Sequence, residues 1–291
     1  MKIAITGANG AFGRRVISGL KGKVPAQNLI ISTRDPANIK ALSDEGLSVR
    51  HGDYTDPASL AAAFLGADRI LIVSPPVVGE AAILQHRAAI QAAKDAGASR
   101  IFYTSHMGAS RHSLFPPMLA HAAAEETLRL SGVAFTSLRH GFYASAAWGM
   151  LGDALSTGSI SLPEDGPVAF TTHGDLAEAA AILLSGEPSI DGVSPPLTAT
   201  EAITFAQIAE MLSELTGKRI RREVISDERY REGLSAKGVP PERMALAMGF
   251  FLSARSGEFE KVGPALENIL NGKPRSMKDF LATQLGQSHI P

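Results

Sequence analysis

The chain has 291 residues, and its 28 lysines and arginines nearly balance 29 aspartates and glutamates, for a formal net charge of -1. At roughly 150 residues per domain, this length predicts two structural units or one large unit with an appendage. Hydrophobic residues make up 45% of the chain and charged residues 20%, as in a globular protein with a large core. The near-neutral charge argues against nucleic acid as a partner. The absence of cysteine excludes disulfides, thiolate metal sites and a cysteine nucleophile.

No segment of the sequence predicts membrane insertion or secretion. The most apolar stretch, residues 69–76, has the length of a strand, whereas a membrane helix needs roughly 20 apolar residues. The N-terminus lacks the pattern of a secretory signal, because Gly7 interrupts its apolar run. We therefore expect a cytoplasmic protein without a membrane partner. The histidines lack metal-ligand spacing, so no metal is predicted.

Short apolar runs alternate with helical patterns over the first half of the chain. Strands are expected at residues 2–6, 28–33, 47–51, 69–73, 100–104 and 134–138. Helices are expected at residues 11–21, 38–45, 57–65, 80–96 and 117–130. This alternation, with short turns between the elements, predicts right-handed crossovers and an α/β fold with a Rossmann-type, doubly wound parallel sheet.

The alternation ends after Arg139. Residues 140–170 are rich in glycine and irregular, residues 173–185 return to a helical pattern, and shorter elements follow. We expect residues 1–140, together with 171–188, to form a dinucleotide-binding Rossmann domain. Residues 141–170 and 189–291 should form a smaller, discontinuous α/β lobe that binds substrate. Ligands of open α/β sheets bind at the carboxyl ends of the strands, so the lobe should cover that edge.

A glycine-rich loop, Gly7-Ala-Asn-Gly-Ala-Phe-Gly13, follows the first strand and opens the first helix. A glycine triplet is also ordinary turn chemistry, but this placement between strand and helix is typical of dinucleotide binding. Glycine allows the backbone to approach a pyrophosphate, and free N–H groups at the helix start attract its charge. The predicted phosphate-binding residues are Gly7, Asn9, Gly10, Ala11, Phe12 and Gly13.

The end of the second predicted strand bears on which dinucleotide binds. Arg34 follows Thr33 at that end, where a carboxylate favours NAD and an arginine favours the 2′-phosphate of NADP. The sequence therefore favours NADP(H) over NAD(H). In the alternative interpretation, Arg34 is a solvated residue and Asp35 caps the next helix.

Other strand ends supply further candidates for cofactor binding. Asp53 and Tyr54 follow the third strand, where Asp53 could accept a hydrogen bond from the adenine amino group. Ser74 and Pro75 follow the fourth strand as a rigid turn beside the nicotinamide ribose. Both segments could equally be plain structural turns. Thr104 and Ser105, after the fifth strand, complete the predicted cofactor site.

Several of these segments together resemble a known family. They are the glycine loop, Thr33-Arg34, residues 51–54, 102–105 and 138–143, and the C-terminal residues 216–218, 238–240 and 257–259. The combination is similar to the NmrA-like branch of the atypical short-chain dehydrogenases/reductases, and within it to reductases of triphenylmethane dyes and quinones. The resemblance covers nearly the whole chain, and it implies NADP(H) and a small C-terminal substrate lobe.

The chain departs from the usual catalytic pattern of short-chain dehydrogenases, Tyr-x-x-x-Lys, on the helix after strand five. Here the helix carries His121 and Glu125, four residues apart and therefore on one face. A glutamate raises the pKa of a neighbouring acid, whereas the lysine lowers it. We therefore do not expect alcohol–ketone interconversion by the tyrosine mechanism. Alternatively, His121 and Glu125 are a pair on the helix surface.

With the tyrosine mechanism set aside, we expect a hydride transfer that needs little acid catalysis, to a quinone-like or extended aromatic acceptor. The candidate catalytic residues are His121, Ser105 and Tyr143. His121 could protonate a reduced quinone, since the unperturbed pKa of a histidine lies near neutrality. The candidate substrate-binding residues are His106, Met107, His140, Phe142, Tyr143 and Trp148, although Trp148 could also be plain packing. An alternative function is a non-catalytic NAD(P)-binding redox sensor. The sequence allows a homodimer.

Overall fold

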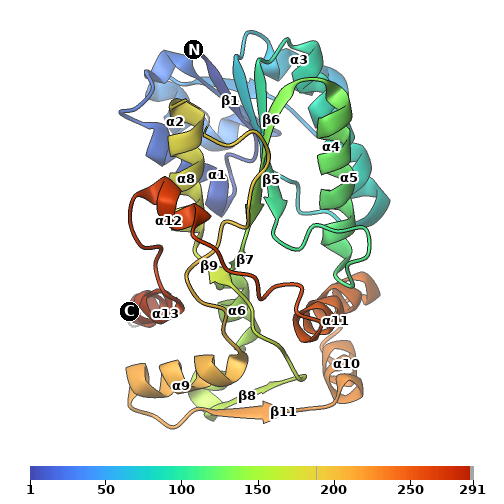
Figure 1. Ribbon diagram of the computed structural model, residues 1–291, viewed down its shortest axis with the longest axis vertical. Coiled ribbons are helices and arrows are strands. Elements are labelled where there is room, and N and C mark those ends of the chain that lie inside the picture. The colour runs from blue at the N-terminus through green and yellow to red at the C-terminus, as the bar shows by residue number, and fades with distance from the viewer. Residues whose placement is uncertain (188, 289–291) are drawn as a thin grey trace.

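Seven parallel strands form the central sheet in the computed structural model, which describes residues 1–187 and 189–288. Their order across the sheet is β10-β6-β5-β4-β1-β2-β3. The sheet, with β1, β5 and β6 labelled, lies between two groups of helices (Figure 1). The strands are β1 (Ile3–Ile5), β2 (Leu29–Thr33), β3 (Ser48–His51), β4 (Arg69–Ile72), β5 (Arg100–His106), β6 (Ala134–His140) and β10 (Gly192–Val193). This order confirms the predicted doubly wound Rossmann-type sheet. Strands β4, β5 and β6 lie on one side of β1, and strands β2 and β3 lie on its other side.

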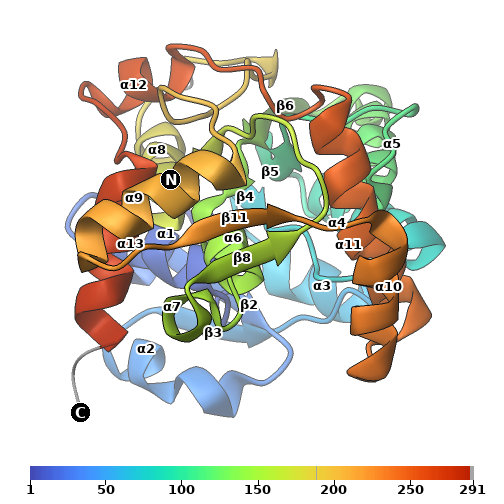
Figure 2. The ribbon, with the colours of Figure 1, turned by 90° about the horizontal axis from the view of Figure 1, so that it is seen from below.

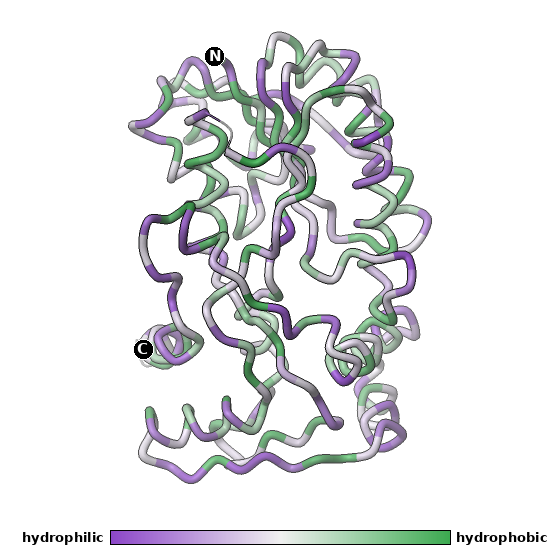
Figure 3. The backbone as a smooth tube through the Cα atoms, in the orientation of Figure 1, coloured by the Kyte–Doolittle hydropathy of each residue, from purple (hydrophilic) through white to green (hydrophobic). Residues whose placement is uncertain are grey.

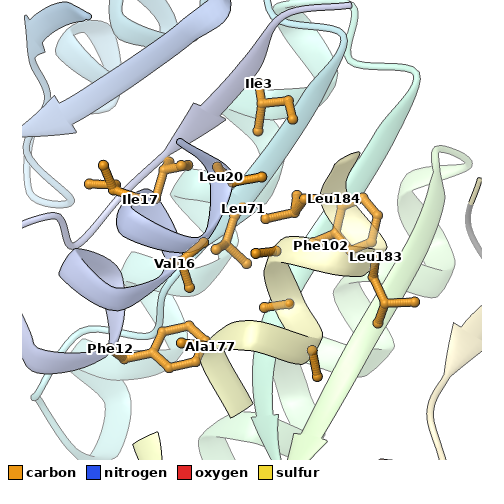
Figure 4. Close-up of a cluster of buried hydrophobic side chains, with 14 of the residues drawn as sticks. Ile3, Phe12, Val16, Ile17, Leu20, Leu71, Phe102, Ala177, Leu183 and Leu184 are labelled. Atoms are coloured by element: carbon orange, nitrogen blue, oxygen red, sulfur yellow. The ribbon is translucent and has the colours of Figure 1, made fainter. Parts of the chain in front are cut away.

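Helices cover both faces of the sheet, which explains why its strands read as continuous apolar runs. On one face lie α1 (Ala11–Leu20) and α8 (His173–Ser185), and the close-up in Figure 4 shows Val16, Leu20 and Leu184 meeting Leu71 and Phe102. On the other face lie α3 (Pro57–Phe64), α4 (Gly79–Asp95) and α5 (Pro116–Ser131). Along α4 and α5, hydrophobic and hydrophilic residues alternate, as expected for helices with one buried face (Figure 3). After β2 the chain forms the 3-10 turn η2 (Pro36–Ile39) and the short helix α2 (Lys40–Asp44).

The strands β5 and β6 run two residues further than the sequence predicts. Their predicted ends are residues 104 and 138, whereas the observed ends are His106 and His140, which are register partners. Polar residues at strand ends carry no apolar alternation, so the pattern stops before the pairing does. The extension places two imidazoles side by side at the carboxyl edge of the sheet.

A smaller lobe lies beyond that edge, as seen from below in Figure 2. Its two-stranded sheets are β7 (Phe142–Tyr143) with β9 (Phe170–Thr171), and β8 (Ser159–Leu162) with β11 (Arg221–Val224). Its helices are α6 (Ala144–Met150), α7 (Ala154–Thr157), α9 (Phe205–Thr216), α10 (Asp227–Ala236), α11 (Pro241–Arg255) and α13 (Met277–Ser288). They surround a separate aromatic core that includes Phe205, Phe250, Phe251 and Phe259.

Two elements within the range predicted for the lobe lie with the sheet instead. Strand β10 pairs with β6, and Leu266 of α12 (Ala265–Leu270) is buried in the same core as α1 and α8. A two-residue strand leaves no periodicity in the sequence, so its pairing could not be predicted. The division into domains stays a prediction, and residues 188 and 289–291 of the predicted ranges lie outside the described residues. Within residues 1–187 and 189–288, no helix has both the length and the hydrophobicity to cross a membrane.

Candidate functional site

The glycine loop is built so that its backbone is exposed at the start of α1. Gly7 has a φ of +67°, in the left-handed region. A Cβ on Gly13 would lie 2.3 Å from the carbonyl oxygen of Gly7, so only glycine fits there. Gly10 is exposed and begins the helix with no side-chain cap among the described residues. The free helix start and the close glycine turn fit a dinucleotide pyrophosphate.

The loop is tied to the end of β2 by Asn9, whose Nδ2 donates to Thr33 Oγ1 at 3.2 Å. Asp35 caps the 3-10 turn η2 by accepting from the backbone N–H of Ala37 at 3.1 Å. Thus the alternative interpretation of Asp35 as a cap is correct. Arg34 is exposed at the end of β2 and directly follows Thr33, the residue to which the loop is tied.

Tyr54 braces three strand ends. Its hydroxyl donates to the carbonyl of Val73 at 2.5 Å and lies 2.7 Å from Thr6 Oγ1. Burial raises its pKa well above the usual value of a tyrosine. The hydroxyl therefore links the segments that follow β1, β3 and β4, where the sequence predicts cofactor binding.

Asp53, Ser74 and Thr104 also make structural contacts at the predicted cofactor site. Asp53 Oδ1 accepts from the backbone N–H and the hydroxyl of Thr55, both at 2.8 Å, and these bonds lower its pKa. The backbone N–H of Ser74 donates to Thr104 Oγ1 at 2.8 Å, which locks the ends of β4 and β5 together. Pro75 follows in the same partly buried turn.

Ser105 faces the helix α5. Its hydroxyl donates to Glu125 Oε1 at 2.8 Å, and Glu125 also accepts from Arg139 Nε at 2.9 Å and Nη2 at 2.6 Å. Glu125 is only 4% exposed, so the interpretation of His121 and Glu125 as a pair on the helix surface is wrong. Because Arg139 comes from β6, the sequence offered no local signal of this ion pair.

His121 contacts two residues that the sequence analysis missed. Its Nδ1 lies 2.8 Å from the hydroxyl of Tyr103, and Nδ1 of His86 on α4 lies 3.3 Å from the same hydroxyl. Burial, with smaller effects of neighbouring histidines, holds the pKa of His121 well below its usual value. Burial therefore removes the near-neutral pKa on which the predicted proton donation by His121 depends, and at neutral pH its ring is uncharged.

His106 and His140 lie among aromatic rings. The ring of His106 meets the rings of Phe142 and Phe259 edge-on, at centroid distances of 5.3 and 5.4 Å. The ring of His140 lies 5.0 Å from that of Phe12 in the glycine loop. Burial lowers the pKa of each imidazole to about 3. This arrangement brings predicted cofactor and substrate residues together in a dry, uncharged environment.

Tyr143, Met107 and Trp148 occupy different surroundings. Tyr143 stacks on His173 at 4.1 Å, and burial raises its pKa to about 12. The backbone N–H of Met107 donates to the carbonyl of His140 at 2.8 Å. Trp148 on α6 packs against the core of the lobe, in agreement with its alternative interpretation as packing.

A cavity of about 360 Å³ opens next to the end of β5. Its lining residues are Met107, Gly108, Ala109, Ser110, His112, Ser113 and Glu258. Glu258 holds the loop in place, since its carboxylate accepts from the hydroxyls of Ser113 and Ser253 and from the backbone N–H of Leu114. In the sequence, Glu258 belongs to a segment that contributed only to the family resemblance.

A second, larger cavity of about 460 Å³ lies on α4 and α5. It is lined by Arg87, Leu119 and Thr127 among others, and none of its lining residues belongs to a strand end. No group of three or more histidine and acidic residues within 1–187 and 189–288 could hold a metal ion.

The rings of His106, His140, Phe142 and Phe259 form an aromatic site beside the glycine loop. Together with the doubly wound sheet and the loop, this site is typical of a dinucleotide-dependent oxidoreductase of the Rossmann class. The chain belongs to the NmrA-like family, whose model matches residues 1–281. This confirms the resemblance found in the sequence.

Individual relatives are similar over most of the chain. Quinone oxidoreductase 2 of Escherichia coli is 37% identical over 241 residues, which cover 82% of each chain. The structure of the NADPH-dependent quinone oxidoreductase from E. coli in complex with NADPH has a TM-score of 0.91 and 31% identity, covering 97% of this chain and 99% of the other. The triphenylmethane reductase of Citrobacter sp. has a TM-score of 0.90 and 31% identity, covering 98% and 100%.

Proposed function

We propose that the chain is an NADPH-dependent reductase that transfers hydride to a quinone-like or extended aromatic acceptor without the Tyr-x-x-x-Lys pair. The observation that carries this proposal is the contact between the glycine loop and the aromatic site, made by Phe12 and His140 at 5.0 Å. This contact supports a planar acceptor bound next to the cofactor. The relatives that reduce quinones and triphenylmethane dyes support the same class of acceptor.

The residues of the chain bind and orient the reactants. The backbone of Gly7, Gly10 and Gly13 and the start of α1 hold the pyrophosphate, and Arg34 binds the 2′-phosphate. Bound NADPH supplies a hydride from its nicotinamide ring. The rings of Phe142 and Phe259 exclude water and align a flat acceptor.

His121 and Glu125, which stand where the usual mechanism has its tyrosine and lysine, are each bonded to another residue of this chain. His121 is neutral and bonded to Tyr103, and Glu125 is neutralised by Arg139. Acceptors that spread charge over their own conjugated system need no strong acid, which fits such a site. In this proposal Ser105 and His121 are therefore positioning residues, through the hydrogen bonds already described, and Tyr143 acts in the same way through its stacking on His173.

The test is to follow NADPH absorbance with the purified chain and a panel of quinones and triphenylmethane dyes, with NADH in parallel. We expect turnover with members of the panel and a preference for NADPH. A protein that binds NADPH but reduces no acceptor would contradict the reductase and favour the redox sensor.

A further inference from the structure

The tautomer of His106 is set by the backbone. Its Nδ1 lies 3.1 Å from the backbone nitrogen of Gly108, whose N–H is a donor and never an acceptor. Nδ1 must therefore carry the lone pair. In a neutral imidazole the proton then lies on Nε2, and burial keeps this ring neutral by lowering its pKa to about 3.

The Nε2–H of His106 is buried and has no hydrogen-bond partner among residues 1–187 and 189–288. Leaving such a buried donor unpaired is unfavourable, because it has lost its hydrogen bond to water without gaining another. The ring is held by Phe142 and Phe259, and a Cβ on Gly108 would lie 2.9 Å from the ring of Phe259. The fold thus keeps an unpaired donor in one orientation.

The donor lies at the carboxyl edge of the sheet. His106 is the last residue of β5, the register partner of His140, and directly precedes the loop that lines the 360 Å³ cavity. Nε2 of His140 is also without a partner among the described residues. Its Nδ1 faces the hydroxyl of Tyr143 at 3.3 Å, which can donate or accept, so the tautomer of His140 is not set in the same way.

We propose that the Nε2–H of His106 donates a hydrogen bond to the carbonyl oxygen of the acceptor and stabilises the negative charge that develops there. This inference rests on the proposed function and names carbonyl-type acceptors as those that use the residue. As the hydride and its electron pair add to a carbon of the conjugated ring, a C=O electron pair moves onto oxygen, and a proton from solvent neutralises that oxygen. The ring carbon that took the hydride then loses a proton to solvent while the second carbonyl oxygen gains one, which gives the hydroquinone. In sum the acceptor gains one hydride and one proton, and NADPH is oxidised to NADP⁺. A triphenylmethane cation takes the hydride on carbon and needs no such donor.

Two substitutions separate the role of His106 as a donor through Nε2–H from its role as the acceptor for the backbone N–H of Gly108. In His106→Asn the amide oxygen can still accept from Gly108, but no donor reaches the position of Nε2. In His106→Gln the amide nitrogen can reach that position, but the acceptor for the turn is lost. With a quinone, we expect His106→Asn to lower kcat/KM about 100-fold and His106→Gln to retain most of it. Because His106 also contacts the aromatic rings of the site, both variants can alter dye reduction, so the diagnostic quantity is the ratio of kcat/KM for the quinone to kcat/KM for a triphenylmethane dye. This ratio should fall about 100-fold in His106→Asn and stay near the wild-type value in His106→Gln. A nearly unchanged Kd for NADPH shows that the variants fold.

The reverse order, with the Gln variant impaired and the Asn variant normal, would show a role in the turn alone and overturn the inference. Equal losses with quinones and dyes would overturn it as well. If the wild-type protein reduces dyes but no quinone, the inference fails while the reductase function stands, and if it reduces neither, the proposed function itself fails. Independently of activity, ¹H–¹⁵N NMR of the histidine side chains at neutral pH should show His106 as the Nε2–H tautomer. A proton on Nδ1 would contradict the proposal.

Discussion

Glu125 on α5 accepts two hydrogen bonds from the guanidinium of Arg139 on β6, at 2.9 and 2.6 Å. The carboxylate also accepts from the hydroxyls of Ser105 and Ser137, at 2.8 and 3.0 Å. This ion pair lies behind the carboxyl ends of β5 and β6. It therefore supports the strand ends that carry His106 and His140.

Removal of Glu125 should destabilise the protein. Glu125→Ala leaves Arg139 half-buried without its anion, and breaking a buried pair in this way costs about 3 kcal/mol. The measurement is the free energy of unfolding in urea. The matched control is Glu126→Ala, whose partner Arg129 is exposed on the same helix, and which should cost less than about 1 kcal/mol. Equal losses for the two variants would refute the supporting role of Glu125.

Arg34 should discriminate between the two dinucleotides. The residue is exposed at the end of β2, and a charged hydrogen bond to the 2′-phosphate is worth about 2 kcal/mol. Arg34→Ala should therefore weaken NADPH binding about 30-fold and leave NADH binding nearly unchanged, as measured by fluorescence titration. Arg243→Ala, an exposed arginine on α11, serves as the control. Equal weakening of NADPH and NADH by Arg34→Ala would remove the phosphate contact from the mechanism.

Gly13 should tolerate no side chain. In Gly13→Ala the new methyl group would collide with the carbonyl of Gly7 at 2.3 Å, so the loop must open and lose its shape for the pyrophosphate. We expect NADPH binding to fall below detection by calorimetry. Gly286→Ala on α13 meets no atom within 4 Å and should bind NADPH normally. Normal binding by Gly13→Ala would show that this turn does not hold the cofactor.

The buried histidines should make the protein sensitive to acid. In the folded protein, burial lowers the pKa of His106 and His140 to about 3 and that of His86 and His173 to about 4. An unfolded histidine has a pKa of about 6.5, so between roughly pH 6.5 and 4 the unfolded chain binds more protons than the folded protein. Stability is therefore complete above that window and falls as pH decreases, by about 1.4 kcal/mol per pH unit for each histidine.

Replacement of one buried histidine tests this dependence. His140→Phe removes one group that takes up a proton on unfolding, so the slope of the unfolding free energy between pH 6 and 4 should decrease by about 1.4 kcal/mol per pH unit. Chemical denaturation at a series of pH values measures that slope. The exposed His112 provides the control variant His112→Gln, which should leave the slope as it is. An unchanged slope in His140→Phe would mean that His140 is not buried as a neutral ring.

Local patterns were enough to predict the first six strands, the helices between them and the glycine loop. Each of these features depends on neighbours within a few residues: apolar periodicity, turn chemistry, and the need for glycine between β1 and α1. The pairing of β10 with β6 was missed, because two residues have no period and their partner lies more than 50 residues away. The ends of β5 and β6 were missed for a similar reason, since His106 and His140 are polar.

The residue types at the site followed from the sequence, but their chemical states did not. The sequence by itself determined the family, the sheet and the loop that fits a dinucleotide, because short-range patterns encode them. Only the tertiary structure decided that Glu125 is neutralised by Arg139, that His121 is uncharged, and that His106 presents an Nε2–H. Protonation depends on desolvation and on the charges and donors that surround a group, and in this protein those come from strands and helices far apart in the chain.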